Sequence, residues 1–204
     1  LFNMLFNNKF ILASSSKSRY KILKNNKLKF KVIKPKCNED FLKKKLIKNK
    51  TSPKKISLEL ARLKSKEVSK IKKNIIVVGS DTIINFNGVI LSKAKNLIEA
   101  EKKIKKISGK KHSIYSSVSV YYNEKEIFNA SQKSQIKIRK LNNLDIKKYL
   151  SKSGSDILTS VGCYQAELLG PNIIENIKGD FFNIMGFPLF PFLNFLNKYN
   201  IKKI

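Results

Sequence analysis

The sequence contains few of the residues that build metal or disulfide sites. Cys37 and Cys163 are its only cysteines, with no Cys-x-x-Cys spacing, and His112 is its only histidine. This excludes a zinc site of the usual type and a disulfide framework, and it favours a reducing compartment. Nothing approaches the roughly 20 apolar residues of a membrane span. Residues 1–10 carry several polar residues and no small-residue cleavage site, so we expect a cytoplasmic protein with no membrane partner.

Acidic residues are scarce, at 14 against 43 basic residues, which gives a net charge of +29. Such a charge is typical of a protein that binds nucleic acid or another polyanion. Only three of the basic residues are arginines, however, and the lysines are spread along the chain among many Ile and Asn residues, as an AT-biased coding sequence produces. Nucleic-acid grooves favour the bidentate fork of arginine. We therefore do not expect nucleic acid as the primary partner, although a positive field also attracts a triphosphate.

The order of apolar segments predicts an α/β protein. The 204 residues, 42% of them apolar, suffice for one well-cored domain or two lobes. With no repeat, linker or clear boundary, we expect a single domain over residues 1–204. Expected strands lie at 9–13, 29–34, 75–80, 82–86, 89–91, 112–122 and 126–138 and as short strands after 160; expected helices lie at 19–24, 40–48, from 51 onward, 96–107, 145–152 and 188–199.

The first candidate site is the serine-rich turn Ala13–Arg19. A buried strand that runs through small hydroxyl residues into a helix start brings hydroxyls, free backbone N–H groups and the positive helix end to one point. Arg19 can place its forked guanidinium on an oxyanion there. The turn therefore fits a phosphate cradle, and serine capping of an ordinary helix explains it equally well.

The second candidate site is the segment Gly79–Thr82. Asp81 is expected at the carboxyl end of a buried strand, where α/β sheets place ligands, and a carboxylate there can orient a water or hold a metal. The hairpin signal Asn87–Gly88 would bring Lys93 back to neutralise a phosphate. An aspartate that leaves a strand is more often a turn former, so this motif is weak by itself.

Three further features favour structural roles when taken alone. Glu39 is typical of an acidic residue at a helix start, where it interacts with the helix dipole, and Lys64 is typical of the solvent-exposed face of an amphipathic helix. The phenylalanines at Phe181–Phe182 and in Phe187–Phe195 fit the core better than a base-stacking surface.

Eight motifs in order nevertheless resemble the Maf family of nucleotide pyrophosphatases, over about residues 10–199. The matching segments are Ser14-Ser-Ser16-Lys-Ser-Arg19, Asn38-Glu39, Leu60-Ala-Arg-Leu-Lys64-Ser65, Gly79-Ser-Asp81-Thr82, Ile90-Leu-Ser-Lys93, Ile107-Ser-Gly-Lys-Lys-His112, Val161–Glu167 and Ile177–Leu189.

The resemblance implies a fold and a reaction. The fold is a long mixed, twisted sheet flanked by helices, with two lobes around a cleft, similar to inosine triphosphate pyrophosphatase, and the protein is a homodimer. The reaction is hydrolysis of the α–β phosphate bond of a nucleoside triphosphate to the monophosphate and pyrophosphate. A divalent cation, Mg²⁺ or Mn²⁺, is the implied cofactor because this chemistry depends on positioning and charge neutralisation.

The resemblance also implies a role for each matched residue. Asp81 is the base that orients water, and Glu39 and Asp81 are metal ligands. The remaining assignments are phosphate contacts by Arg19, Lys64 and Lys93, phosphate-chain binding by Ser14 and Ser16, and base selection by Ser18, Thr82 and Glu167.

The chain departs from the family pattern at Lys17 and Ser18, which replace the usual proline and first arginine. Of the base-selecting positions, Thr82 resembles the dTTP/UTP type, Glu167 the 7-methyl-GTP type, and Ser18 neither. The base therefore stays open. Two other classes remain as alternatives: a non-catalytic nucleic-acid or polyanion binder, and a cell-division regulator, which the family's history as septum-formation proteins suggests.

Overall fold

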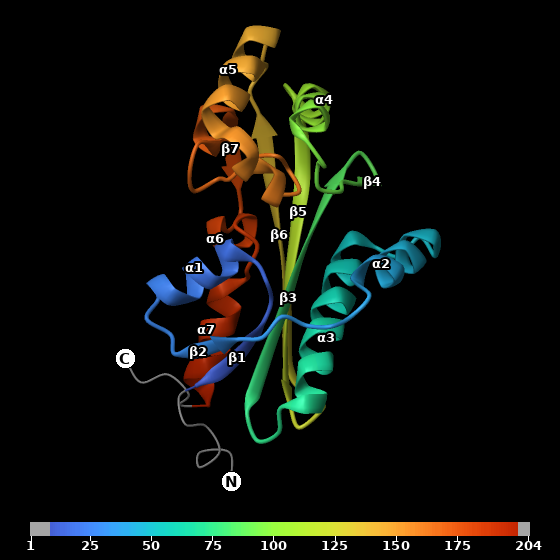
Figure 1. The fold of residues 1–204 in the computed structure, drawn as a ribbon, viewed down its shortest axis with the longest axis vertical. Coiled ribbons are helices and arrows are strands. Elements are labelled where there is room, and N and C mark those ends of the chain that lie inside the picture. Colours follow the sequence, from blue (N-terminus) through green and yellow to red (C-terminus); the bar gives the residue numbers. More distant parts are fainter. Residues whose placement is uncertain (1–8, 200–204) are drawn as a thin grey trace. The chain divides into compact units, whose positions relative to one another are not determined.

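The computed structural model describes residues 9–199, so the expectation about the opening residues lies largely outside the described range. Seven strands and seven α-helices occupy these residues (Figure 1). They are β1 (Phe10–Ala13), α1 (Lys17–Asn25), β2 (Phe30–Val32), α2 (Glu39–Lys48), α3 (Pro53–Ile71), β3 (Ile76–Phe86), β4 (Val89–Ile90), α4 (Leu97–Ile107), β5 (Lys111–Tyr122), β6 (Lys125–Ile138), α5 (Asn143–Ser153), β7 (Ile174–Lys178), α6 (Phe181–Ile184) and α7 (Leu189–Lys198). Within that range no helix combines the length and apolarity that crossing a membrane requires.

The strands form one mixed sheet in the order β2-β1-β3-β5-β6-β7, with β4 paired to β3. β1 pairs in parallel with β2 and β3, whereas β4 and β7 pair antiparallel with β3 and β6. The mixed sheet with flanking helices confirms the expected α/β class. Contacts divide the chain into two compact units: the described part of unit 1 comprises residues 9–82, 116–132 and 186–199, and unit 2 comprises 83–115 and 133–185.

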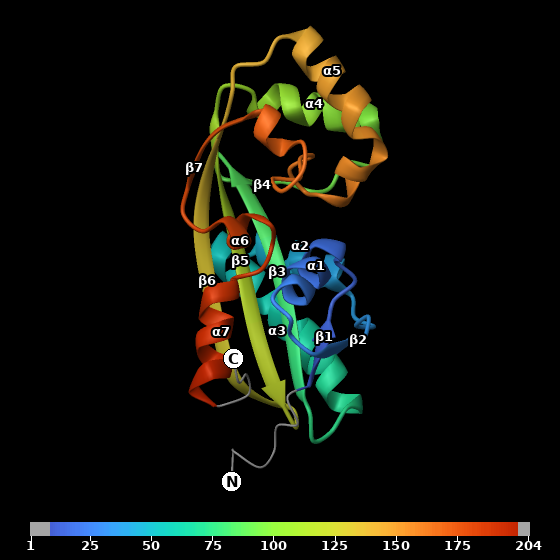
Figure 2. The same ribbon diagram turned by 90° about the vertical axis from the view of Figure 1, so that its left-hand side faces the viewer.

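Unit 1 is built around the strand β1, all four residues of which are buried. α3 covers one face of the sheet in this unit, and α1 and α7 cover the other (Figures 1 and 2). The terminal phenylalanines hold α7 in place: Phe192 packs edge-on against Phe10 and Phe187, and Phe195 stacks on Phe128. Phe187, Phe192 and Phe195 are thus core residues, as expected, whereas Phe181 and Phe190 are exposed.

Unit 2 has its own apolar core, which includes Ile104, Ile114, Ile136, Ile146 and Tyr164. Two of its helices, α4 and α5, begin at asparagine caps, which favour helix starts: the Asn96 side chain accepts from Glu99 N, and Asn142 forms a capping box with Asp145.

Three expectations about local structure need correction. The strand expected to end at Ser80 continues through Asp81 to Phe86, so Asp81 lies within β3 and not at its end. Its parallel neighbour β1 pairs with β3 only as far as Gly79, so Asp81 lies just beyond the end of that neighbour. The strand expected at 29–34 is only three residues long. The short strands expected after residue 160 reduce to β7 alone in the described chain, and the stretch before it forms turns and a 3₁₀ helix at Gly170–Asn172.

Candidate active site

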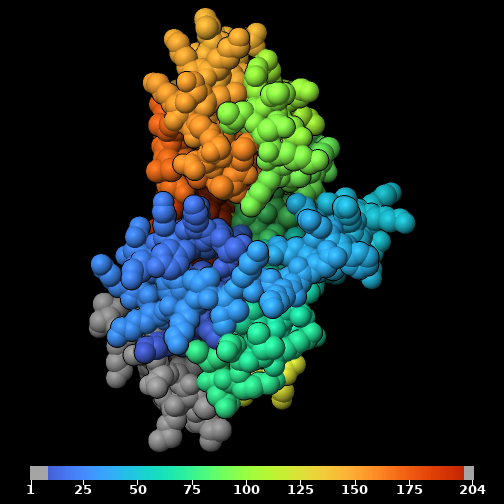
Figure 3. Space-filling view, in the orientation of Figure 1, coloured from blue at the N-terminus to red at the C-terminus, as the bar shows by residue number. Residues whose placement is uncertain are grey.

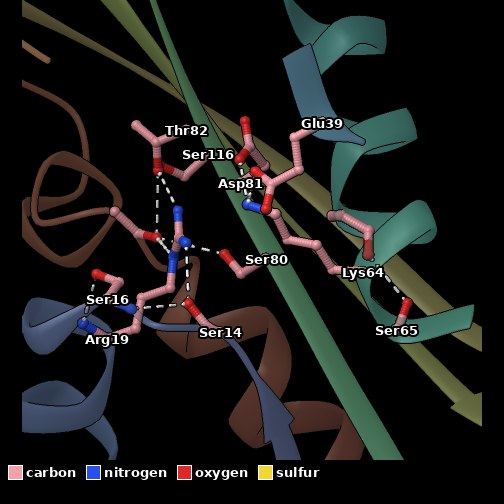
Figure 4. Close-up of polar contacts among 12 residues, drawn as sticks. Ser14, Ser16, Arg19, Glu39, Lys64, Ser65, Ser80, Asp81, Thr82 and Ser116 are labelled. Atoms are coloured by element: carbon pink, nitrogen blue, oxygen red, sulfur yellow. Dashed lines mark hydrogen bonds and ion pairs between the residues drawn. The ribbon is translucent and has the colours of Figure 1, made fainter. Parts of the chain in front are cut away.

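Lys64, Asp81 and Glu39 form a compact charged cluster in unit 1 (Figure 4). The Lys64 ammonium donates to Asp81 Oδ1 at 2.7 Å and contacts Glu39 Oε2 at 2.7 Å. The Lys64 side chain is 7% exposed and that of Asp81 13%, whereas the Glu39 side chain is 41% exposed. One buried cation thus joins a buried carboxylate to one that solvent reaches.

Small residues allow α3 to come close enough to β3 for this contact. A Cβ added at Gly79 would lie 2.3 Å from the carbonyl oxygen of Ala61 and 2.7 Å from the backbone nitrogen of Ser65, so only glycine fits. Ala61, Lys64 and Ser65 share one face of α3 because helix positions three and four apart are neighbours. Gly79 and Asp81 share one face of β3 because strand side chains alternate. The close approach therefore brings Lys64 onto Asp81.

Arg19 is the centre of a second polar cluster in unit 1. Its Nε donates to the carbonyl oxygen of Gly186 at 2.8 Å, its Nη1 to Ser14 Oγ at 3.2 Å, and its Nη2 to Thr82 Oγ1 at 3.1 Å. Arg19 is only 8% exposed, and all three of these acceptors are uncharged. Among residues 9–199 the Arg19 guanidinium is held by neutral oxygens and has no direct ion pair, which suits it to bind an anion.

The electrostatics of this arginine reflect its burial. Desolvation lowers the pKa of the Arg19 guanidinium, and the nearby carboxylates Asp81 and Glu39 oppose this shift. Arginine is basic enough in proteins that its guanidinium stays protonated at neutral pH. The positive charge is therefore a fixed feature of unit 1.

The serine turn acts both as a helix cap and as support for Arg19. Ser14 Oγ accepts from the backbone N–H of Ser16 as well as from Arg19, and Ser16 Oγ accepts from the Arg19 backbone N–H at the start of α1. The capping explanation is confirmed, because Ser16 is the N-cap of α1, and the phosphate cradle stays a prediction. Ser18 lies in the first turn of α1.

Gly186 was missed by the sequence reasoning as a member of this cluster. Its carbonyl oxygen accepts from Ser80 Oγ and Thr82 Oγ1, both at 3.3 Å, in addition to Arg19. Thr82 Oγ1 also hydrogen-bonds Ser116 Oγ at 3.0 Å. Ser80 and Thr82 project from β3 on the face opposite Asp81, so successive residues of one strand supply the two clusters (Figure 4). A backbone carbonyl carries no signal in the residue pattern, and Ser116 lies in an ordinary alternating strand.

The two carboxylates in the Lys64 cluster suit a divalent cation only if a substrate supplies further oxygen ligands. Across residues 9–199, no three His, Cys, Asp or Glu side chains come together as a metal site. Glu39 and Asp81 do converge, since both lie 2.7 Å from the same ammonium. Mg²⁺ is usually held by one or two carboxylates plus phosphate oxygens and water, so this pair suits such an ion.

The segment that leads into α2 lines an open surface hollow in unit 1. Residues 34–40, which include Glu39, border this hollow of about 830 Å³. Figure 3 shows the chain around these residues, in light blue, at the surface of unit 1. Glu39 therefore connects the buried cluster to an open hollow.

The remaining two expected residues, Lys93 and Glu167, belong to unit 2. Lys93 is exposed and Glu167 is partly exposed. Lys93 follows the hairpin that the sequence predicted at Asn87–Gly88, where Asn85 pairs with Ile90. The structure thus places eight of the ten expected residues in unit 1 and these two in unit 2.

Unit 2 also contains a buried pair that the sequence did not single out. Nε2 of His112 hydrogen-bonds the Tyr164 hydroxyl at 2.5 Å. Burial lowers the pKa of His112 to about 4, so the imidazole is neutral at neutral pH, and burial raises the pKa of Tyr164.

Comparison with known proteins agrees with this architecture. The family model of the Maf-like proteins matches residues 9–199. A 7-methyl-GTP pyrophosphatase of Bartonella henselae is 37% identical over 94% of this chain and 96% of its own length. A nucleoside triphosphate pyrophosphatase of Caulobacter vibrioides is 32% identical over 91% of this chain and 92% of its own, and a dTTP/UTP pyrophosphatase of Thermosipho melanesiensis is 34% identical over 88% and 91%. The chain belongs to the Maf-like family.

Proposed function

We propose that this protein is a nucleoside triphosphate pyrophosphatase. The observation that carries the proposal is a buried carboxylate in unit 1, Asp81, that is paired with one buried cation, Lys64, and lies within the electrostatic reach of a second, Arg19. The relatives named above act on nucleoside triphosphates according to their names, and their similarity extends over nearly the whole chain. Buried cations suit an anionic substrate, and a buried carboxylate beside them suits a reaction in which water attacks that substrate.

The proposed reaction is attack of water on the α-phosphorus. Asp81 orients the water and accepts its proton as the new P–O bond forms. The bond between the α-phosphorus and the bridging oxygen breaks, and pyrophosphate leaves with that oxygen. Arg19 and Lys64 neutralise the charge on the phosphates, with Ser14 and Ser16 as further donors near Arg19.

A divalent metal, Mg²⁺ or Mn²⁺, fits between Glu39 and Asp81 when substrate phosphates complete its shell. When bound, the metal neutralises phosphate charge. Lys64, which contacts both carboxylates, would be the cation beside them that binds the phosphates.

The base remains open between pyrimidine and 7-methylguanine. Thr82 is held by Arg19 and Ser116 in unit 1, while Glu167 belongs to unit 2. We assign base selection to Ser18, Thr82 and Glu167 on the family resemblance.

We further propose that residues 1–204 form one domain, because β3, β5 and β6 each contribute to both units. We also propose that the protein is a cytoplasmic homodimer.

The reaction is tested by the products formed from dTTP, UTP, CTP, 7-methyl-GTP, GTP and ITP with Mg²⁺ or Mn²⁺. We expect one or two of these nucleotides to yield a monophosphate and pyrophosphate. In ¹⁸O-labelled water the label should enter the monophosphate, since water attacks the α-phosphorus. Orthophosphate as the first product, or label in pyrophosphate, would assign cleavage to another bond, and salt-sensitive nucleic-acid binding without turnover would favour the polyanion binder.

Lys93→Ala should lower kcat/KM for the preferred nucleotide by at least about tenfold. Loss of a charge-assisted phosphate contact costs about 1.5–3 kcal/mol, which corresponds to a factor of this size or more. Lys95→Ala is the matched control, because Lys95 is an exposed lysine of the same segment and should leave kcat/KM unchanged. Equal values for the two variants would remove Lys93 from the phosphate contacts.

A further inference from the structure

The His112–Tyr164 pair is buried too deeply to touch a substrate. His112 on β5 is 2% exposed and Tyr164 is 3% exposed, and their ring centroids lie 5.7 Å apart. His112 Nδ1 has no partner among residues 9–199, so within them the bond to Tyr164 is the side chain's one polar contact. Burying two polar side chains costs free energy unless they hydrogen-bond each other. The bond therefore fixes the two side chains, and the backbone segments that carry them, relative to each other.

Tyr164 anchors a tightly folded segment. The preceding Cys163 has a positive φ of 56°, which non-glycine residues rarely adopt. A Cβ added at Gly162 would lie 2.5 Å from the Tyr164 ring, so the backbone wraps closely around this side chain. Beyond it, the backbone N–H groups of Leu168 and Gly170 both donate to the carbonyl oxygen of Gln165. The loop that these bonds close contains Glu167.

The same segment contacts the chain that carries Lys93. The backbone of Ala94, the residue after Lys93, hydrogen-bonds the Cys163 side chain. Ala94, Cys163 and Tyr164 also belong to one apolar core cluster. One anchored segment therefore fixes the backbone next to both unit 2 candidates, Glu167 for the base and Lys93 for the phosphates.

We propose that His112 and Tyr164 are positioning residues that set nucleotide selectivity by holding the 162–170 segment in unit 2. The proposal rests on the proposed function, since it assumes that Glu167 contacts the base. A direct role in the chemical step is excluded by their burial, so the pair acts on substrate preference and not on bond cleavage.

The test removes the hydrogen bond while keeping the ring, with Tyr164→Phe. Selectivity is the ratio of kcat/KM for the preferred nucleotide to that for the next best one. We expect this ratio to fall by about tenfold or more, through KM, with kcat within threefold of the wild type, because a base-contacting loop has lost its anchor. His112→Phe should do the same, whereas His112→Gln, which can still bond the tyrosine hydroxyl, should keep most of the selectivity.

Tyr121→Phe is the matched control, because Tyr121 is another buried tyrosine, located in unit 1. A purely structural role of the pair would lower the melting temperature and leave the selectivity ratio unchanged, which would overturn the proposal. Hydrogen exchange gives a readout without turnover: in Tyr164→Phe the amides of Leu168 and Gly170 should exchange at least about tenfold faster. Unchanged exchange would overturn the anchoring, whereas a wild-type protein that cleaves no nucleotide would overturn the proposed function and the selectivity role with it.

Discussion

Asp81→Asn should lower kcat/KM for pyrophosphate release by about 10²–10⁴, the range that a positioned general base contributes. An amide cannot take the proton of the attacking water, although it keeps the size of the carboxylate. The fold should survive, because the Lys64 ammonium keeps Glu39 as a second partner at 2.7 Å and is not left as an unpaired buried charge. Steady-state assays together with a thermal melt separate the two effects.

Glu126→Gln is the matched control for this experiment. Arg62 forms ion pairs with Glu126 and Glu59, just as Lys64 does with Asp81 and Glu39. Glu126→Gln therefore also replaces one carboxylate of a cation with two carboxylate partners by an amide. It should leave kcat/KM within about twofold of the wild type, since nothing places this triad in the site. If the two variants were equally active, Asp81 would not be the base.

Much of unit 1 could be predicted because local pattern and packing agree there. The buried strand β1, the serine cap of α1 and the proline at the start of α3 all follow from residue preferences. The apparent strand end at Ser80 misled the reasoning for a physical reason. Three consecutive polar residues are typical of a turn, yet β3 continues through them because Ser80, Asp81 and Thr82 find partners on its two faces.

The geometry of the site could be predicted only in part. Motif order identified Arg19, Lys64 and Asp81 as candidates, but alternation along β3 puts Asp81 on one face and Thr82 on the other, so the site consists of two clusters. Arg19 bonds the Gly186 carbonyl, a contact across 167 positions that no side-chain pattern encodes. The His112–Tyr164 bond is of the same kind, because each residue alone fits an ordinary core position.

Arg19→Lys should show how much unit 1 depends on the planar fork of Arg19. Lysine cannot reach Ser14, Thr82 and Gly186 together, so at least one of the three charge-assisted bonds is lost, each worth about 1.5–3 kcal/mol. Burial would also lower the pKa of the lysine and favour its neutral form. We expect the free energy of unfolding, measured by denaturant titration, to fall by about 3 kcal/mol.

The activity of Arg19→Lys should fall further than this loss of stability alone explains. With the fork gone, kcat/KM for the preferred nucleotide should drop by about tenfold or more in protein that is still folded, since one phosphate contact of this kind is worth roughly a factor of ten or more. Arg62→Lys is the control: this arginine is 31% exposed and pairs with two carboxylates, so its unfolding free energy should change by no more than about 1 kcal/mol. A folded Arg19→Lys enzyme with full activity would restrict Arg19 to holding β1, β3 and residue 186 together, and would leave Lys64 as the phosphate-binding cation of unit 1.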